Sequence, residues 1–211
     1  MATWMTSYAA SKCVVLLRVQ RYAAFCLFSS LLLDPCLYAQ AHEPVHGTVQ
    51  GHTYSDSRFG LSYEYPDTLE TMSSLPNGMP VGTGEKQGVS EFLFSAMEKP
   101  NGIVRKGVFI VTDPKGTFGA NDVPQYLRQL LVLSLGAKEP IEISPIVIRG
   151  QSFFRASVGG EAQVHFYGAQ LSTLCGDHFL DFVFSGPSPE KVEELVRSLD
   201  RLRLNCPASK P

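Results

Sequence analysis

Apolar and polar residues alternate in the first regular stretch of the chain, SRFGLSYEYPDTLE at residues 57–70. A period of two residues predicts a strand with one buried face. Pro66 has no N–H to donate to a neighbouring strand, so the strand is expected to end there. The apolar face of this strand is predicted to consist of Phe59, Leu61, Tyr63 and Tyr65.

Two further strands are predicted at residues 90–98 and 106–112, on either side of the turn sequence Pro100-Asn101-Gly102. Simple alternation along these strands decides which side chains share a face. One face is expected to carry Phe92, Phe94 and Ala96 from the first strand, with Val108 and Ile110 aligned in the second.

The hydrophobic period changes to that of a helix in the segment NDVPQYLRQLLVLSLG, residues 121–136. Asp122 or its neighbour Asn121 can cap the start, and Gly136 suits the end. Apolar residues recur at the spacing of one helical face, at Val123, Tyr126, Leu127, Leu130 and Leu131.

The second half of the chain predicts four more strands joined by tight turns that contain glycine. The turns are Arg149-Gly150, Gly159-Gly160 and Cys175-Gly176-Asp177. Such turns between alternating stretches are typical of an antiparallel meander. The strands are expected at residues 143–148, 151–158, 162–174 and 178–184.

A second helix is predicted after the meander, with Ser188 as its N-cap and Pro189 in the first helical position. Glu190 suits the positive end of the helix dipole. The buried stripe of this helix is expected to consist of Val192, Leu195, Val196 and Leu199.

Together these elements predict an α+β fold. Its expected core is one central antiparallel sheet of six to seven strands flanked by helices, in an α/β/α sandwich or a two-layer α+β sandwich. Each helix has a single apolar stripe, so each is expected to cover a face of the sheet and not to pack in a helical bundle. The folded domain is predicted to span residues 57–206, followed by a disordered tail at 207–211.

Residues 1–41 have the three-part pattern of a secretory signal peptide. Basic residues precede an apolar run of 12 residues from Tyr22 to Leu33, and small residues end the segment at Ala41. A spanning helix needs roughly 20 apolar residues, so cleavage after Ala41 is favoured over an uncleaved anchor. Residues 42–56 are polar and are predicted to form a flexible N-terminal arm. The chain is therefore expected in the periplasm or outside the cell, without stable membrane insertion after cleavage.

The charge of the chain limits its partners. It carries 18 basic and 20 acidic residues, a formal net charge of −2. Cleavage would remove three basic and one acidic residue and leave a net charge of −4. Such a mildly acidic chain with interspersed charges is not expected to bind nucleic acid.

Three of the five cysteines, Cys13, Cys26 and Cys36, would leave with the signal peptide. The remaining pair, Cys175 and Cys206, predicts a structural disulfide in an oxidising compartment. A bridge across a loop of about 30 residues would stabilise the fold by about 3–4 kcal/mol. Two unpaired, half-buried thiols are the alternative.

The order of the elements resembles the PsbP-like family, named after the oxygen-evolving enhancer protein of photosystem II. The resemblance covers residues 57–205 and rests on the early strand FGLSYEYP, the strand pair before the first helix, and the meander GQSFFRASVGGEAQVHFYGAQLSTLCGDHFLDFVFSG with its closing helix SPEKVEELVRSLDRLRL. It implies an antiparallel sheet between helices. It also implies an exported, non-catalytic binding or assembly domain, whose partner would be a protein or a small ligand. No metal, cofactor or catalytic residue of the family is carried over to this chain.

Histidines offer an alternative function. His42 would become the amino terminus after cleavage, and its amine and ring, with a second histidine such as His46, form a set that suits copper. Further ligands are available at His52, His165 and His178. A copper-binding oxidoreductase is therefore the alternative hypothesis, although incidental histidines in a flexible arm are the simpler interpretation.

Cys175 and His178 lie close enough in sequence to suggest a nucleophile with its base, as in a hydrolase. Their position in a tight turn and the presence of Cys206 favour a structural role instead. The glycine-rich fragment GTGE at residues 82–85 lacks the preceding strand of a phosphate-binding loop. The sequence therefore predicts no catalytic set and no cofactor, and the chain is not expected to be an enzyme.

Asp181 is an acid inside an apolar strand, on the face opposite Leu180 and Phe182. A cross-strand pair with Arg155 is expected to compensate its charge. A ligand pocket between sheet and helix would need the same aromatic residues as the core. The aromatic core is predicted to contain Phe92, Phe94, Phe153, Phe154, Phe166, Phe179, Phe182 and Phe184.

Overall fold

The computed structural model describes residues 47–72, 90–99, 106–135, 137, 140–160 and 166–207. These residues form two antiparallel sheets and two α-helices, which confirms the predicted α+β class with a large antiparallel sheet. In spatial order, the seven-stranded sheet consists of β4 (Glu70–Thr71), β5 (Glu91–Met97), β6 (Gly107–Pro114), β10 (His178–Gly186), β9 (Phe166–Cys175), β8 (Gln151–Gly160) and β7 (Ile143–Ile148). The small sheet consists of β1 (Gly47–Gln50), β2 (Thr53–Asp56) and β3 (Leu61–Glu64).

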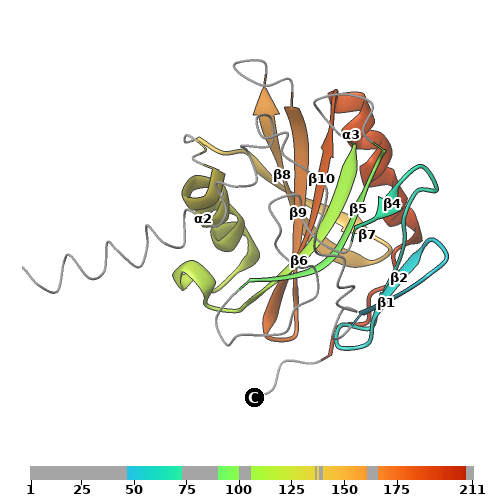
Figure 1. The fold of residues 1–211 in the computed structure, drawn as a ribbon. Coiled ribbons are helices and arrows are strands. Elements are labelled where there is room, and N and C mark those ends of the chain that lie inside the picture. The colour runs from blue at the N-terminus through green and yellow to red at the C-terminus, as the bar shows by residue number, and fades with distance from the viewer. Residues whose placement is uncertain are drawn as a thin grey trace, which may run out of the picture.

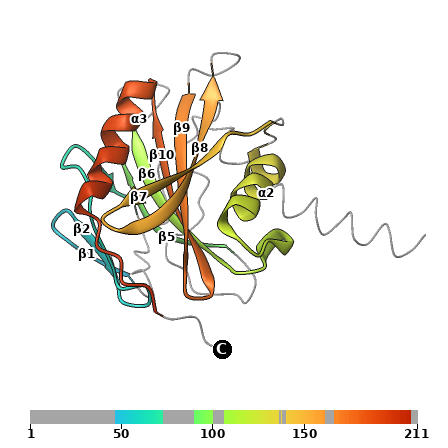
Figure 2. The same ribbon diagram turned by 180° about the vertical axis from the view of Figure 1, so that it is seen from behind.

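The two helices lie on opposite sides of the large sheet (Figures 1 and 2). Helix α2 (Val123–Leu135) follows the short 3-10 turn η1 (Thr117–Gly119) and packs on β7, β8 and β9. Helix α3 (Pro189–Val196) continues into the 3-10 turn η2 (Arg197–Arg201) and packs on β9 and β10. Since each helix covers one face, the sheet has an α2 side and an α3 side. Within the described ranges, no helix is both long and apolar enough to cross a membrane.

Both helices begin as their sequences predict. The Ser188 hydroxyl accepts a hydrogen bond from the N–H of Lys191, and Pro189 occupies the first turn of α3. A carboxylate oxygen of Asp122 accepts the N–H of Gln125 at 2.8 Å at the start of α2. The predicted apolar stripes of both helices are buried. Gly136, the predicted end of α2, lies outside the described residues.

The small sheet corrects the predicted flexible arm for residues 47–56, which form β1, β2 and the turn between them, whereas residues 42–46 of that prediction lie outside the described residues. The side chains of Tyr54 and Asp56 point inward from β2, and the ring of Tyr54 stacks on Phe94 at 4.8 Å between centroids. The polar Asp56 interrupts the apolar alternation, so the sequence of β2 does not look like a strand with a buried face. The α3 side of the large sheet is thus covered by a helix and by a second sheet, whose residues share one core cluster.

A β-bulge in β5 corrects the predicted alternation of this strand. Phe92 pairs with Val111 and Phe94 pairs with Ile110, so Leu93 is an extra residue between them. As a result, Phe92 packs with Val111 on the α2 side, whereas Phe94 belongs to the core on the α3 side. The predicted shared face of Val108 and Ile110 is confirmed, since both lie in the core on the α3 side.

The meander β7-β8-β9-β10 is confirmed, with one displaced turn. Arg149 and Gly150 have φ values of 54° and 82°, the left-handed conformations of a type I′ hairpin turn. In contrast, the predicted turn at 159–160 is wrong, because β8 continues to Gly160, which pairs with Phe166. The residues that connect β8 to β9 lie outside the described part of the chain.

Candidate functional site

A polar cluster lies on the α2 side of the large sheet, between apolar neighbours. Asp113 of β6 pairs with Phe179 of β10, and Asp181 of β10 pairs with Val111 of β6. The two acids are therefore diagonal neighbours on the same face of the sheet. Tyr126 of α2 reaches them from above, with its ring stacked on Phe179 at 4.1 Å between centroids. We refer to Asp113, Tyr126 and Asp181 as the tyrosine–carboxyl cluster.

The hydroxyl of Tyr126 lies between the two carboxyl groups. Its oxygen is 2.6 Å from Oδ2 of Asp113 and 2.5 Å from Oδ2 of Asp181. Both distances are those of strong O–H···O hydrogen bonds. The hydroxyl is thus the bridge that joins helix α2 to strands β6 and β10.

Neutral side chains donate to the outer oxygens of the two carboxyl groups. The hydroxyl of Ser172 and the amide of Gln170 donate to Oδ1 of Asp181. The hydroxyl of Ser90 donates to Oδ1 of Asp113. These donors satisfy the oxygens without supplying positive charge.

Burial controls the ionisation of the cluster. Asp113 and Asp181 are 1% exposed, and Tyr126 is 0% exposed. Burial, with the nearby Asp113 carboxyl as a second cause, raises the pKa of Asp181 to about 7. Burial also raises the pKa of Asp113 and keeps the pKa of Tyr126 well above its ordinary value. The cluster therefore favours protonated forms.

The chemistry open to this cluster is proton sharing inside the fold. Its groups can pass a proton from carboxyl to hydroxyl, as the acids and bases of enzymes do. However, a reacting substrate must come within hydrogen-bond reach of such groups, and the three side chains are closed to solvent. The cluster thus serves the packing of α2 on the sheet.

The predicted pair of Asp181 with Arg155 is wrong. Asp181 pairs with Ser172 of β9, and Ser172 pairs with Phe154 of β8. The residue of β8 aligned with Asp181 is therefore Phe154, and Arg155 is the next residue along the strand. A shift of one residue turns a side chain to the other face of the sheet. Arg155 accordingly forms an ion pair with Glu193 of α3, on the opposite side from Asp181.

A second set of buried acids joins the small sheet to the large one. The guanidinium of Arg58 lies 2.9 Å from a carboxylate oxygen of Asp56 and 2.9 Å from one of Glu91. Asp56 is 1% exposed and Glu91 is 5% exposed. Here a cation lies between the two acids, whereas a neutral hydroxyl occupies that position in the tyrosine–carboxyl cluster.

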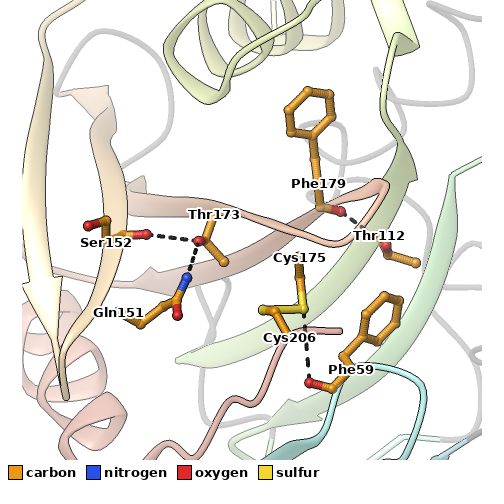
Figure 3. Close-up of a disulfide and its surroundings, with 8 residues drawn as sticks. All are labelled: Phe59, Thr112, Gln151, Ser152, Thr173, Cys175, Phe179 and Cys206. Atoms are coloured by element: carbon orange, nitrogen blue, oxygen red, sulfur yellow. Dashed lines mark hydrogen bonds between the residues drawn. A yellow bond between two sulfur atoms is a disulfide. The ribbon is translucent and has the colours of Figure 1, made fainter. Parts of the chain in front are cut away.

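The predicted disulfide between Cys175 and Cys206 is present, with 4.8 Å between the two Cα atoms. Figure 3 shows it at the end of β9, where Cys175 Sγ also lies 3.9 Å from the carbonyl oxygen of Phe59. The bridge fixes the C-terminal segment beside β3, where the N–H of Asn205 donates to the carbonyl of Gly60. Gly60 has a φ of 53°, and a Cβ there would lie 2.7 Å from the Asn205 carbonyl oxygen. The bridge also removes Cys175 as a candidate nucleophile.

The histidines do not gather into a metal site in the described part of the chain. His52 packs its ring edge against Tyr65, and His178 packs edge-on against Phe59. Among the described residues, no group of three or more His, Cys, Asp or Glu side chains is arranged to hold a metal ion. The predicted copper ligands His42, His46 and His165 lie outside those residues, as does the fragment at 82–85.

The predicted aromatic core is confirmed for most of its described members. Phe94, Phe153, Phe179, Phe182 and Phe184 are each 3% exposed or less. Phe154 is half-buried, and the side chain of Phe166 lies outside the described set.

Sequence reasoning found Asp181 and Tyr126 separately but missed Asp113. The signal was the position of Asp113 two residues after Val111, which places it on the strand face that carries Phe109 and Val111. A polar side chain buried beneath a helix needs a hydrogen-bond partner, and the helix can supply it. No family model matches the chain, and no curated protein matches it in sequence.

Proposed function

We propose that this chain is an exported, non-catalytic domain that binds or assembles with a protein or a small ligand, in the manner of PsbP-like proteins. The observation that carries the proposal is the Cys175–Cys206 disulfide. Disulfides persist in oxidising compartments, which agrees with the signal-peptide pattern of residues 1–41.

Two features of the fold support a binding role over a catalytic one. The two aspartates whose pKa values burial raises, Asp113 and Asp181, belong to the closed tyrosine–carboxyl cluster, where they bind Tyr126 of α2. The candidate nucleophile Cys175 is consumed by the bridge. The antiparallel meander with its closing helix also agrees with the PsbP-like order of elements.

Intact-mass spectrometry of the exported protein tests compartment and thiol state together. We expect a chain that starts at His42, is unreactive to a thiol alkylating reagent, and gains two hydrogens on reduction. A cytoplasmic, full-length chain with two reactive thiols would contradict the proposal. A chain that starts at His42 and retains one copper ion would favour the oxidoreductase alternative.

The binding role is tested by capture from the exported fraction of the native host. The oxidised protein is the bait, and the same protein, reduced and alkylated, is the matched control. We expect a defined partner or ligand that binds the oxidised form with measurable affinity after purification. Turnover of a substrate by the oxidised protein alone would contradict the non-catalytic assignment.

A further inference from the structure

When both carboxyl groups of the tyrosine–carboxyl cluster are ionised, the Tyr126 hydroxyl has two carboxylate neighbours and one proton to donate. The Tyr126 hydroxyl carries one proton, and it is within hydrogen-bond distance of Oδ2 of both Asp113 and Asp181. One proton makes one hydrogen bond, so the second contact needs a proton from a carboxyl group. The geometry is satisfied by a chain in which one protonated carboxyl donates to Tyr126 and Tyr126 donates to the other carboxylate.

The remaining donors cannot replace this proton. The hydrogen bonds of Ser90, Gln170 and Ser172 go to the Oδ1 atoms, whereas the Tyr126 oxygen faces the Oδ2 atoms. With both carboxyl groups ionised, one carboxylate oxygen would face the lone pairs of the tyrosine oxygen at hydrogen-bond distance in a buried site. Such an unsatisfied buried contact is strongly unfavourable.

The nearby charged groups act differently on the two carboxyl groups. On β10, His178 lowers the pKa of Asp113, against the larger rise that burial causes. The groups that act on Asp181 are the Asp113 carboxyl and the neutral donors Ser172, Tyr126 and Gln170. Arg155 of β8 points to the α3 side, where it pairs with Glu193. On α2 and after β6, Arg128 and Lys115 are exposed. From β9, the cluster receives the neutral Ser172 and Gln170.

We propose that the tyrosine–carboxyl cluster holds one shared proton in the folded protein and that loss of this proton loosens helix α2 from the sheet. When the proton leaves, the carboxyl O–H bond breaks, the electron pair stays on Oδ2, and the proton passes to water. The domain would then contain a pH-sensitive contact between Tyr126 on one side and strands β6 and β10 on the other. This inference does not depend on the proposed binding function.

The sign of the pH effect follows from proton linkage. Asp181 has an ordinary pKa of 3.8 and a folded pKa of about 7. Between these values the folded state holds a proton that the unfolded chain has released, so stability falls as pH rises. Below pH 3.8, Asp181 is protonated in both the folded and the unfolded state. Above about pH 7 it is ionised in both states, so stability no longer changes with pH.

Urea unfolding of the purified protein at pH 5.0 to 8.0 and constant ionic strength tests the proposal. For one shared proton, the unfolding equilibrium constant is expected to rise about tenfold per pH unit up to about pH 7 and then level off. Asp181→Asn removes the titrating group with little change of shape, so this part of the pH dependence should disappear. Asp200→Asn, the same substitution at an exposed position, should keep the wild-type dependence.

The decisive comparison is between wild type and Asp181→Asn in how the unfolding equilibrium constant depends on pH. A difference of about one proton supports the shared proton, whereas parallel profiles overturn it. If Asp181→Asn does not fold, Asp113→Asn offers the same comparison from the other side of Tyr126. Carbonyl-carbon NMR of the wild type gives a readout without mutation: an aspartic carboxyl that titrates near neutral pH supports the proposal. Full ionisation of every aspartate by pH 5 contradicts it.

Discussion

The two faces of the large sheet hold their acidic residues in opposite ways. On the α3 side, Glu194 lies at the exposed rim, 2.9 Å from both Lys191 and Lys106. The hydrogen bond from Lys191, followed by that from Lys106, lowers the pKa of Glu194 to about 2. On the α2 side, Asp181 is buried among neutral donors, and burial raises its pKa to about 7.

This difference teaches that the surroundings of a carboxyl group, and not its residue type, set the sign of its effect on stability. Glu194 contributes stability above its ordinary pKa of 4.5 and loses that contribution as pH falls toward 2. Asp181 reduces stability as pH rises from 3.8 to about 7. The α3 side therefore favours neutral pH over acid, while the α2 side favours mild acid over neutral pH.

The largest effect is expected in the apolar core on the α3 side. Phe182 is 0% exposed and lies edge-on to Tyr63 and Phe153, at 6.1 and 6.0 Å between ring centroids. Phe182→Ala should lower the free energy of unfolding by about 3–5 kcal/mol through lost burial and a cavity. Urea unfolding measures it, with Val147→Ala at a 69% exposed position as the control. A loss for Phe182→Ala no larger than that of the control would refute this packing.

The disulfide should have the next largest effect. Cys206→Ser opens a bridge between residues 31 positions apart. The free energy of unfolding is expected to fall by about 3–4 kcal/mol, because the unfolded chain gains conformational entropy. Wild-type protein measured in reductant is the matched control and should show the same loss. Equal stability of oxidised and reduced protein would mean that the bridge does not restrain the fold.

Two tyrosine substitutions compare the faces directly. Tyr126→Phe leaves two buried carboxyl groups without their shared hydroxyl, so we expect a loss of about 1–3 kcal/mol at pH 7. Tyr63→Phe is the matched change on the α3 side, where the hydroxyl contacts Ser198 at 2.7 Å. Ser198 also donates to the carbonyl of Leu195, so the expected loss is smaller, about 1 kcal/mol. A larger loss for Tyr63→Phe in urea unfolding would reverse the proposed contrast.

The smallest expected effect is at the helix caps. Ser188→Ala removes the acceptor for the Lys191 N–H at the start of α3 and should lower the free energy of unfolding by about 1 kcal/mol. Asp122→Ala is the equivalent change at the start of α2, and a similar loss is expected. Thermal unfolding followed by circular dichroism measures both. No loss in either variant would mean that these caps do not stabilise the helices.

The features that could be predicted from the sequence are those encoded by residues close together along the chain. The stripe of α2, the Ser188 cap and the Arg149-Gly150 turn each follow from a few neighbouring residues. The disulfide could be predicted because an exported chain would retain just Cys175 and Cys206.

The features that were missed depend on partners far apart in sequence. The strand β2 is hidden because Asp56 is buried with Arg58, which also binds Glu91, 33 positions further on. Alternation does not reveal the bulge at Leu93, since the extra residue becomes visible in the pairing with β6. The partner of Asp181 depends on the register of β10, β9 and β8. An error of one position in this register assigns Arg155 to the wrong face of the sheet.

Hydrogen exchange at pH 5.5 and pH 7.5, corrected for the intrinsic rate, tests the contrast between the faces most directly. The two probes are the amides of α2 at Val123–Leu135 and of α3 at Pro189–Val196. We predict that the opening equilibrium of α2 increases more at the higher pH than that of α3, whose amides change only as far as they exchange through global unfolding. Equal changes in both helices, or protection of α2 that is independent of pH, would contradict the account.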